Sequence, residues 1–235
     1  MTTAKKPLPA SDLERLRALD TCTASNAIER FNVRLRNEGF VHGAIQCLFP
    51  DFAPMLGYAV TARARSSSPP MTGCCYYDRL DWWEYVLSLP KPRVLVLQDV
   101  DHQAGIGAFV GEIHARIGLA LDCVGCITNG AVRDLPAVEK TGFQLFAGSV
   151  AVSHSYAHIV DFGEPVEIGG LKIHPGDLMH GDRHGVHIIP HEIAHEIPQV
   201  AEALVADERR LIELCRSPEF TLEQLASRFH QPNQT

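Results

Sequence analysis

The sequence predicts an α/β fold built around two parallel strands that a helix connects. Residues 94–97 form an uninterrupted apolar run, typical of a strand buried on both faces, and residues 124–128 form a second such run. Strands joined in this way pair in parallel, and ligands of such sheets bind beyond the carboxyl ends of the strands. The connecting helix is indicated by apolar residues at helical spacing: Ile113, Ile117, Ala120, Leu121 and Val124.

The segment before this unit is expected to be helical first and then to supply one more strand. Ser11 and Glu14 are spaced as a capping box, which would open a helix that runs to about residue 19. Further elements are predicted from periodicity, namely a helix at 23–35, a strand at 57–65, and a helix at 76–89 whose Trp82 and Trp83 are packing residues.

The segment after the unit is expected to alternate short strands with helices. A Gly-Gly turn between alternating apolar residues predicts a hairpin over 166–173. The other elements predicted are a short helix at 135–141 closed by Gly142, strands at 143–146, 150–153 and on both sides of 182–185, a helical region at 191–215 interrupted at Pro198, and a helix at 221–229.

Length and composition predict one soluble globular domain, with an N-terminal helical segment at 11–36, a core at 57–190 and C-terminal helices at 191–229. The chain has 235 residues, of which 46% are hydrophobic and 21% charged. Its net charge of −7 argues against nucleic acid as a partner, and no apolar run is long enough for a membrane helix. The N-terminus does not resemble a signal peptide, and seven cysteines without scaffold spacing favour a cytoplasmic location.

The glycines at 105, 107 and 111 precede the connecting helix and predict an anion site. Their spacing has one residue too many for a dinucleotide fingerprint, and Asn129 stands where an acidic residue would end the next strand. A helix that begins in a glycine turn presents unpaired N–H groups and the positive end of its dipole. Such a terminus receives a carboxylate or phosphate. The alternative is a tight turn that binds nothing.

Arg133 and Asp134 follow the second strand and are the main candidate site residues. An arginine at the mouth of a parallel sheet suits bidentate recognition of a carboxylate. The neighbouring Asp134 can hold a hard divalent cation, because Mg²⁺ commonly takes only one or two protein carboxylates. Glu112, at the start of the connecting helix, could orient a metal-bound water. The alternative is a surface salt bridge that caps the helix at Leu135.

Three further motifs favour structural roles. His191-Glu192-Ile193-Ala194-His195 matches H-E-x-x-H, but Pro198 follows closely, so a solvated helix is preferred to a zinc peptidase. Cys123 and Cys126 form a C-x-x-C that enters a buried strand, which predicts inert thiols. The late histidines, His180 to His195, are expected to be surface or interface residues, with metal binding as the minority alternative.

The motif residues resemble those of the RraA-like family. The resemblance rests on Gly111-Glu112-Ile113, Gly125 and the run from Asn129 to Asp134, and extends more loosely over residues 15–205. The family includes class II pyruvate aldolases that cleave 4-hydroxy-4-methyl-2-oxoglutarate and 4-carboxy-4-hydroxy-2-oxoadipate. The resemblance implies a layered α/β/β core of the swivelling-domain type. It also implies a homotrimer or homohexamer, with the site near a subunit interface.

The resemblance assigns expected roles to the site residues. Asp134 would hold Mg²⁺ or Mn²⁺, Glu112 would orient metal-bound water, and Arg133 would contact the substrate. Backbone N–H groups around Gly111 and Ile113 would take the pyruvyl carboxylate. Three positions differ from the family's common pattern, because Asn129 replaces an Asp, Val110 stands where a Trp is frequent, and Asn26 stands where an Asp is frequent.

The expected function is therefore a metal-dependent lyase (class II aldolase) that cleaves a small 4-hydroxy-2-keto acid to pyruvate through a stabilised enolate. Oxaloacetate decarboxylation would be a side activity because it forms the same enolate. One alternative is a non-catalytic regulator that binds a protein partner, although the regulator branch of the family lacks the acidic residue found here as Asp134. A second alternative is a different enolate-forming enzyme that acts on a sugar acid.

Overall fold

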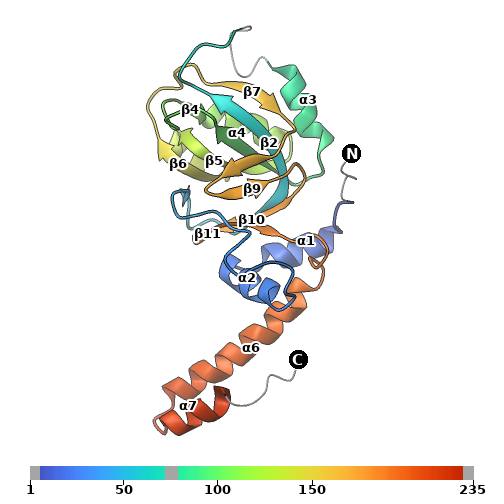
Figure 1. The fold of residues 1–235 in the computed structure, drawn as a ribbon, viewed down its shortest axis with the longest axis vertical. Helices are drawn as coiled ribbons and strands as arrows, with labels where there is room; N and C mark the ends of the chain where they lie inside the picture. Colours follow the sequence, from blue (N-terminus) through green and yellow to red (C-terminus); the bar gives the residue numbers. More distant parts are fainter. Residues whose placement is uncertain (1–5, 72–78, 230–235) are drawn as a thin grey trace.

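The computed structural model describes residues 6–71 and 79–229, and its centre is a large mixed sheet (Figure 1). The parallel pair predicted from sequence is confirmed, because β3 and β5 lie side by side with α4 as their connection. Two more strands extend the parallel part on either side. The five elements concerned are β2 (Met55–Arg65), β3 (Arg93–Asp99), α4 (Glu112–Ala120), β5 (Cys123–Val132) and β6 (Gln144–Val150).

Antiparallel strands complete the sheet, whose order is β1-β6-β5-β3-β2-β10-β11. Off this path, β7 pairs with β2 and β4 pairs with β5. The strands involved are β1 (Gln46–Cys47), β4 (Ala108–Val110), β7 (His158–Phe162), β10 (Leu178–Asp182) and β11 (Gly185–Ile189).

Two local predictions around the parallel strands are wrong. The glycine turn contains a strand, β4, because Ala108, Phe109 and Val110 are apolar and buried and pair in parallel with β5. The two strands predicted at 143–146 and 150–153 are one strand, β6, which ends at Val150. Strand β5 also runs on to Val132 and passes through Asn129 and Gly130 as an irregularity in its pairing with β6.

Alternating side chains of the central strands build two cores. Leu95 and Leu97 face α3 (Leu80–Ser88), α4 and α5 (Leu135–Glu139), together with the buried Trp82. Val94 and Val96 face the hairpin of β8 (Val166–Ile168) and β9 (Leu171–Ile173). One face of the sheet is therefore covered by helices and the other by strands, which confirms the expected α/β/β layering. The packing role predicted for Trp82 and Trp83 is also confirmed, since both are buried.

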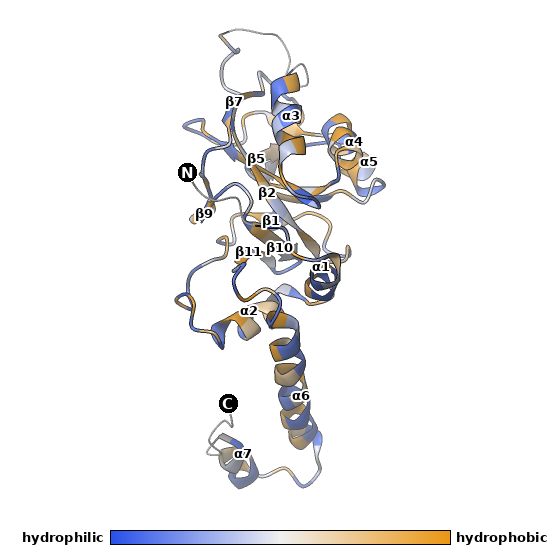
Figure 2. Cartoon of the chain, turned by 90° about the vertical axis from the view of Figure 1, so that its right-hand side faces the viewer, coloured by the Kyte–Doolittle hydropathy of each residue, from blue (hydrophilic) through white to orange (hydrophobic). Residues whose placement is uncertain are grey.

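The terminal helices pack together at the β10–β11 side of the molecule (Figures 1 and 2). They are α1 (Ala10–Arg17), α2 (Thr21–Glu29) and α6 (Ile197–Arg216), with α7 (Leu222–Phe229) at the far end of α6. The capping box predicted at Ser11 is not formed, because α1 begins one residue earlier without a side-chain cap. Asp20 caps α2 instead, through a hydrogen bond from the Thr23 amide.

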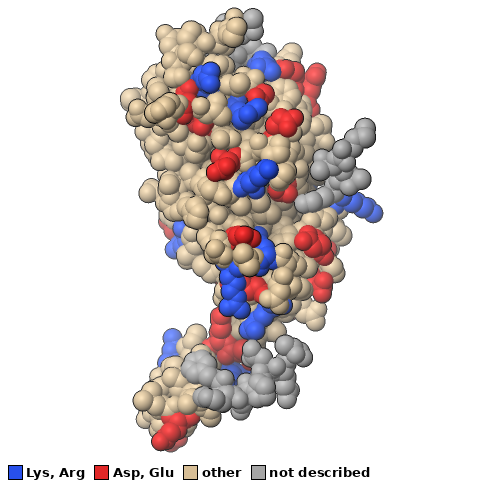
Figure 3. Space-filling view, viewed as in Figure 1, with Lys and Arg blue, Asp and Glu red and all other residues tan. Residues whose placement is uncertain are grey.

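Charged side chains of both signs are mixed on the surface. On the face drawn in Figure 3, Lys and Arg are interspersed with Asp and Glu, and neither sign forms a continuous stripe. Every helix within residues 6–71 and 79–229 is too short or too polar to span a lipid bilayer. Part of the predicted helix at 76–89 falls on residues 72–78, outside the described residues, and the described part forms α3.

Candidate active site

The parallel pairing of β4 and β5 brings the two predicted site segments together. Val110 and Val132 are register partners, and the Arg133 amide donates to the Val110 carbonyl at 2.9 Å. Gly111, directly after Val110, and Asp134, two residues after Val132, therefore meet at the carboxyl edge of the sheet. This is the edge at which ligands of parallel sheets bind, and the segments are more than twenty residues apart in the chain.

Asp134 is joined to the start of α4. Its Oδ2 accepts a hydrogen bond from the Glu112 amide at 3.2 Å. A Cβ added to Gly111 would lie 2.5 Å from the same oxygen, so the close approach requires glycine at this position. Asp134 itself has a φ of 57°, in the left-handed region that costs energy for a residue with a side chain. Strained backbone of this kind is concentrated at functional sites.

Arg133 lies beside this carboxylate and partly in solvent. Its Nε is 3.5 Å from Asp134 Oδ2, and the two side chains are 30% and 43% exposed. Below it, His114 is buried and packs against Phe109, with 5.0 Å between ring centroids. Burial, and then the nearby Arg133 charge, lower the pKa of His114 to about 3. The histidine is therefore neutral at physiological pH and adds no repulsion to Arg133.

Glu112 reaches the same mouth but is held by a neighbour. Its carboxylate accepts from Arg116 Nε at 2.8 Å and pairs with Nη2 at 2.7 Å, one turn along α4. Ile113, the next residue, is more than half exposed. The predicted site residues Gly111, Glu112, Ile113, Arg133 and Asp134 are thus gathered at one edge of the sheet.

The sequence analysis gave no role to Asp99 and Asp101, which shape the same edge. Asp99 follows the apolar run of β3 and accepts from the Gly105 amide at 2.8 Å, which fixes the glycine turn. Asp101 accepts from the amides of Ser66 and Ser67. Desolvation would raise the pKa of Asp101, but these hydrogen bonds and those of the serine hydroxyls outweigh it and lower the pKa. Two aspartates directly after a parallel strand were the available signal.

Asn129 belongs to this supporting structure and not to the Asp134 carboxylate. Its Oδ1 accepts from the Asp99 amide at 2.7 Å, and its Nδ2 donates to the Asp99 carbonyl at 2.9 Å. An amide provides the acceptor and the donor that this two-way contact needs. The side chain therefore holds β5 to the end of β3.

The residues fit a hard cation held by few protein ligands. Within the described residues, the contacts of the Asp134 carboxylate are made by Oδ2. The other carboxylate oxygen, Oδ1, is left as a possible metal ligand. Glu112 is the second carboxylate at this mouth. Within residues 6–71 and 79–229, no three His, Cys, Asp or Glu side chains gather around a possible ion. A cation here would keep most of its water shell, as Mg²⁺ commonly does.

The H-E-x-x-H motif is not helical. Residues 191–196 form turns, and α6 begins after them with Pro198 in its first turn, so both the predicted solvated helix and its interruption are wrong. The C-x-x-C prediction agrees with the structure, since both thiols are buried. Desolvation raises the pKa of Cys123 to about 12, so this thiol is inert.

The surface placement predicted for the late histidines is wrong for His180 and His187. Both are buried, and His180 Nδ1 lies 2.9 Å from His187 Nε2. His180 Nε2 lies 3.1 Å from the Leu19 carbonyl, which can only accept. His180 is therefore protonated at Nε2, and His187 donates to its Nδ1. These strand residues face inward because α2 covers the end of β10, where Asp182 accepts from Thr21.

Known proteins resemble this chain over most of its length. The RraA-like family model, described as Aldolase/RraA, matches residues 21–188. The chain belongs to the RraA-like family. The match includes the whole candidate site and ends near the last strand of the sheet.

Two curated relatives and one solved structure illustrate the range of this family. Over 143 residues the chain is 28% identical to Protein DlpA of Legionella pneumophila, and this covers 60% of the chain and 23% of DlpA. Over 102 residues it is 30% identical to a protein of Halalkalibacterium halodurans that bears the provisional name 4-hydroxy-4-methyl-2-oxoglutarate aldolase, covering 43% of the chain and 49% of that protein. The matches thus span less than half of either relative.

The solved structure is Streptomyces coelicolor RraAS2, described as an unusual member of the RNase ES inhibitor RraA protein family. It superposes with a TM-score of 0.66 at 20% identity, over 90% of this chain and 100% of that chain. At this identity the likeness concerns the fold. It confirms the swivelling-domain-like core that the resemblance implied.

Proposed function

We propose that the protein is a divalent-metal-dependent lyase that cleaves a small 4-hydroxy-2-keto acid and releases pyruvate. The observation that carries the proposal is the joining of Asp134, Arg133 and the first turn of α4 at one mouth of the sheet. Membership of a family described as Aldolase/RraA and the provisional name of the relative from H. halodurans support the same reaction class.

The substrate carboxylate would be received by Arg133 and the first turn of α4. Arg133 presents a planar guanidinium that matches a carboxylate. The first turn of a helix carries amides without an intrahelical acceptor and the positive end of the dipole. Because the Glu112 amide already donates to Asp134, the remaining amides of that turn, including that of Ile113, would receive the anion.

Asp134 would hold the cation, which would be Mg²⁺ or Mn²⁺. When bound, such a cation supplies polarisation of the 2-keto oxygen and so favours cleavage of the bond between C3 and C4. Glu112 would orient a water that accepts the proton of the 4-hydroxyl group. Arg116 holds the Glu112 carboxylate on the solvent side of α4 and would have to share it during this step. Oxaloacetate, which also yields pyruvate, would be decarboxylated as a side reaction.

The site would lie near an interface between copies of the chain. Val150, the last residue of β6, is 54% exposed and Val152 just after it is 99% exposed, at the same edge as Asp134. Large apolar side chains left in water beside a site are typical of surfaces that another subunit covers. A homotrimer or homohexamer in the cytoplasm remains our expectation. The five cysteines of the described residues are free thiols, as in a reducing compartment.

The test is pyruvate release from 4-hydroxy-4-methyl-2-oxoglutarate and from oxaloacetate, with Mg²⁺ or Mn²⁺ and with EDTA. We expect turnover that EDTA removes and that Asp134→Asn reduces by at least a hundredfold. The matched control is Asp122→Asn, because Asp122 is also a left-handed aspartate, with φ 55°, but lies at the other end of β5. Metal-independent turnover, or full activity of Asp134→Asn, would refute the metal role.

A folded protein without turnover of either substrate would refute the pyruvate-releasing function. That result would favour the sugar-acid alternative, or a protein-binding role such as the description of RraAS2 as a member of an RNase inhibitor family suggests for that protein.

A further inference from the structure

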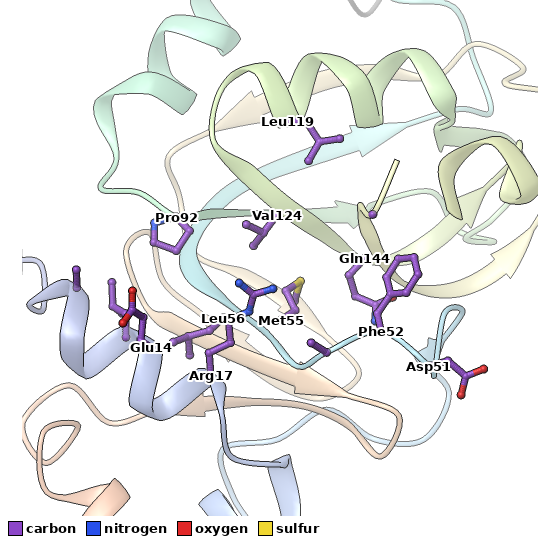
Figure 4. Close-up of a pocket in the computed structure, with 14 residues that line it drawn as sticks. Glu14, Arg17, Asp51, Phe52, Met55, Leu56, Pro92, Leu119, Val124 and Gln144 are labelled. Carbon is purple, nitrogen blue, oxygen red and sulfur yellow. The ribbon is translucent and has the colours of Figure 1, made fainter. Parts of the chain in front are cut away.

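A cavity lies at the opposite edge of the sheet from Asp134. It has a volume of about 610 Å³ and opens between α1 and the amino-terminal ends of the parallel strands (Figure 4). Met55 and Val124, at the beginnings of β2 and β5, form part of its wall, and Leu119 at the end of α4 closes another side. A strand rises about 3.3 Å per residue, so β5 separates this cavity from Asp134 by roughly 30 Å.

The walls are mainly apolar, and the Gln144 side chain among them is occupied. Gln144 donates from Nε2 to the Phe49 carbonyl and accepts at Oε1 from the Leu145 amide, so its amide is satisfied. The volume falls within the range of roughly 300–1,000 Å³ found for small-molecule sites, which are typically apolar with a few polar groups that fix orientation.

Arg17 is the cationic side chain among the residues that line this cavity, which also include the carboxylates Glu14 and Asp51. Its Nε donates to the Pro54 carbonyl at 3.2 Å, which holds the side chain over the opening. In Figure 4 the guanidinium lies beside Met55, and the carboxylates of Glu14 and Asp51 are held apart from it. Among the described residues no carboxylate lies within ion-pair distance of Arg17, and Asp51 pairs with Arg183 outside the cavity. The Nη groups therefore remain available to an anion.

We propose that this cavity binds a small apolar monocarboxylate, with its hydrocarbon part among Met55, Leu119 and Val124 and its carboxylate on Arg17. The charge argument favours this class, because an apolar cavity with one available guanidinium complements a molecule with one negative end and an apolar body. A neutral hydrocarbon would leave the guanidinium unused, and a dicarboxylate such as the substrate of the opposite site would bury a second charge in apolar walls.

Binding can be measured by isothermal calorimetry with octanoate, using the full chain in its native assembly. We expect saturable binding of one octanoate per chain, and roughly tenfold weaker binding of 1-octanol, which has the same chain but no charge. Each methylene buried between hexanoate and octanoate should strengthen binding by about fourfold. Arg17→Gln should weaken octanoate by about tenfold and leave 1-octanol unchanged. Arg15→Gln is the matched control, because Arg15 lies on the same helix and pairs with Glu202 outside the cavity.

A second pair of variants tests the apolar wall. Leu119→Asp places a carboxylate in the cavity on a side chain that is 38% exposed, and should abolish octanoate binding without unfolding the chain. Leu87→Asp, on a 53% exposed leucine of α3, controls for the added charge.

Three results would overturn the proposal. The first is equal binding of octanoate and 1-octanol, and the second is equal loss in the Arg15 and Arg17 variants, because either would indicate non-specific adsorption. The third combines two observations: the parent chain does not bind octanoate, and the Arg17 and Leu119 variants sediment differently from it. This result would identify the cavity as a contact between copies of the chain. These readouts are independent of pyruvate release, so they stand or fall separately from the proposed reaction.

Discussion

The carboxylate of Asp134 accepts a hydrogen bond from the backbone amide of Glu112 at 3.2 Å, across 22 residues of chain. This bond ties the turn after β4 to the turn after β5. The Asp134 side chain, which follows β5, thus accepts from the amide at the start of α4, the helix that follows β4. The position of the candidate site consequently depends on β4, a strand of only three residues.

Gly111→Ala should disturb this contact without removing any functional group. The added Cβ would lie 2.5 Å from Asp134 Oδ2 and 3.1 Å from Arg133 Cγ, so the carboxylate or the helix start must move. We expect a loss of at most about 1 kcal/mol in the free energy of unfolding, because the nearest atom is the end of a partly exposed side chain that can move. Pyruvate release should fall by at least tenfold.

The control for this variant is Gly43→Ala, because a Cβ at Gly43 meets no atom within 4 Å. Chemical denaturation and a coupled pyruvate assay measure both effects. If Gly111→Ala retains the stability and activity of Gly43→Ala, the close approach at Asp134 has no functional importance.

Asn129→Asp should destabilise the protein and should not increase activity. The amide Nδ2 now donates to the Asp99 carbonyl at 2.9 Å, and a carboxylate would place an acceptor against that acceptor. The expected cost is about 1 kcal/mol, as for a half-buried group that loses a hydrogen bond. Asn37→Asp, at an exposed position, is the control. Higher turnover in Asn129→Asp with unchanged unfolding would show instead that this residue acts in the reaction.

The sequence was sufficient to predict the parallel unit and the meeting of its two turns. Buried strands such as β3 have an unbroken apolar run, and the carboxyl ends of parallel strands share one edge, so Arg133 and Gly111 could be placed together. The short strand β4 was missed because three apolar residues in a glycine-rich loop carry no period. Its existence depends on pairing with β5, which is a tertiary effect.

The environment of individual side chains was harder to predict. His180 and Asp182 lie on one face of β10, but that face is covered by α2, and nothing local to the strand indicates this. The contact between Asn129 and Asp99 joins residues 30 positions apart, and no short-range pattern encodes it. The cavity beside Arg17 is formed by residues from five regions of the chain and could not be seen in the sequence.

Stability should fall as the pH drops below about 6.5, because buried histidines resist protonation. The pKa of His114 is lowered to about 3 and that of His180 to about 4, in both cases mainly by desolvation. Between these values and the ordinary pKa near 6.5, the unfolded chain binds protons that the folded chain does not. The stabilisation is therefore complete above pH 6.5 and is lost toward pH 4, at up to about 1.4 kcal/mol per pH unit for each histidine.

His114→Leu should make this pH dependence shallower, because leucine fits the apolar contacts with Phe109 and has no proton to gain. Urea unfolding at pH 7, 6, 5 and 4.5 gives the slope. The control, His102→Leu, removes an exposed histidine and should leave the slope unchanged. Identical slopes for both variants would mean that His114 is not the group that resists protonation.

Arg133→Lys should separate substrate binding from the rest of the reaction. Lysine keeps the positive charge beside Asp134 but cannot donate two parallel hydrogen bonds to a carboxylate. We expect KM for oxaloacetate to rise by about tenfold while kcat changes much less, since uniform binding is lost and the Asp134 carboxylate is retained. Arg116→Lys is the control, because Arg116 pairs with Glu112 on the exposed side of α4, where a lysine can make a similar ion pair. If Arg133→Lys had the same KM as Arg116→Lys, Arg133 would be excluded from substrate binding. If Arg133→Lys instead lowered kcat and kcat/KM equally, Arg133 would contact the substrate in the transition state alone.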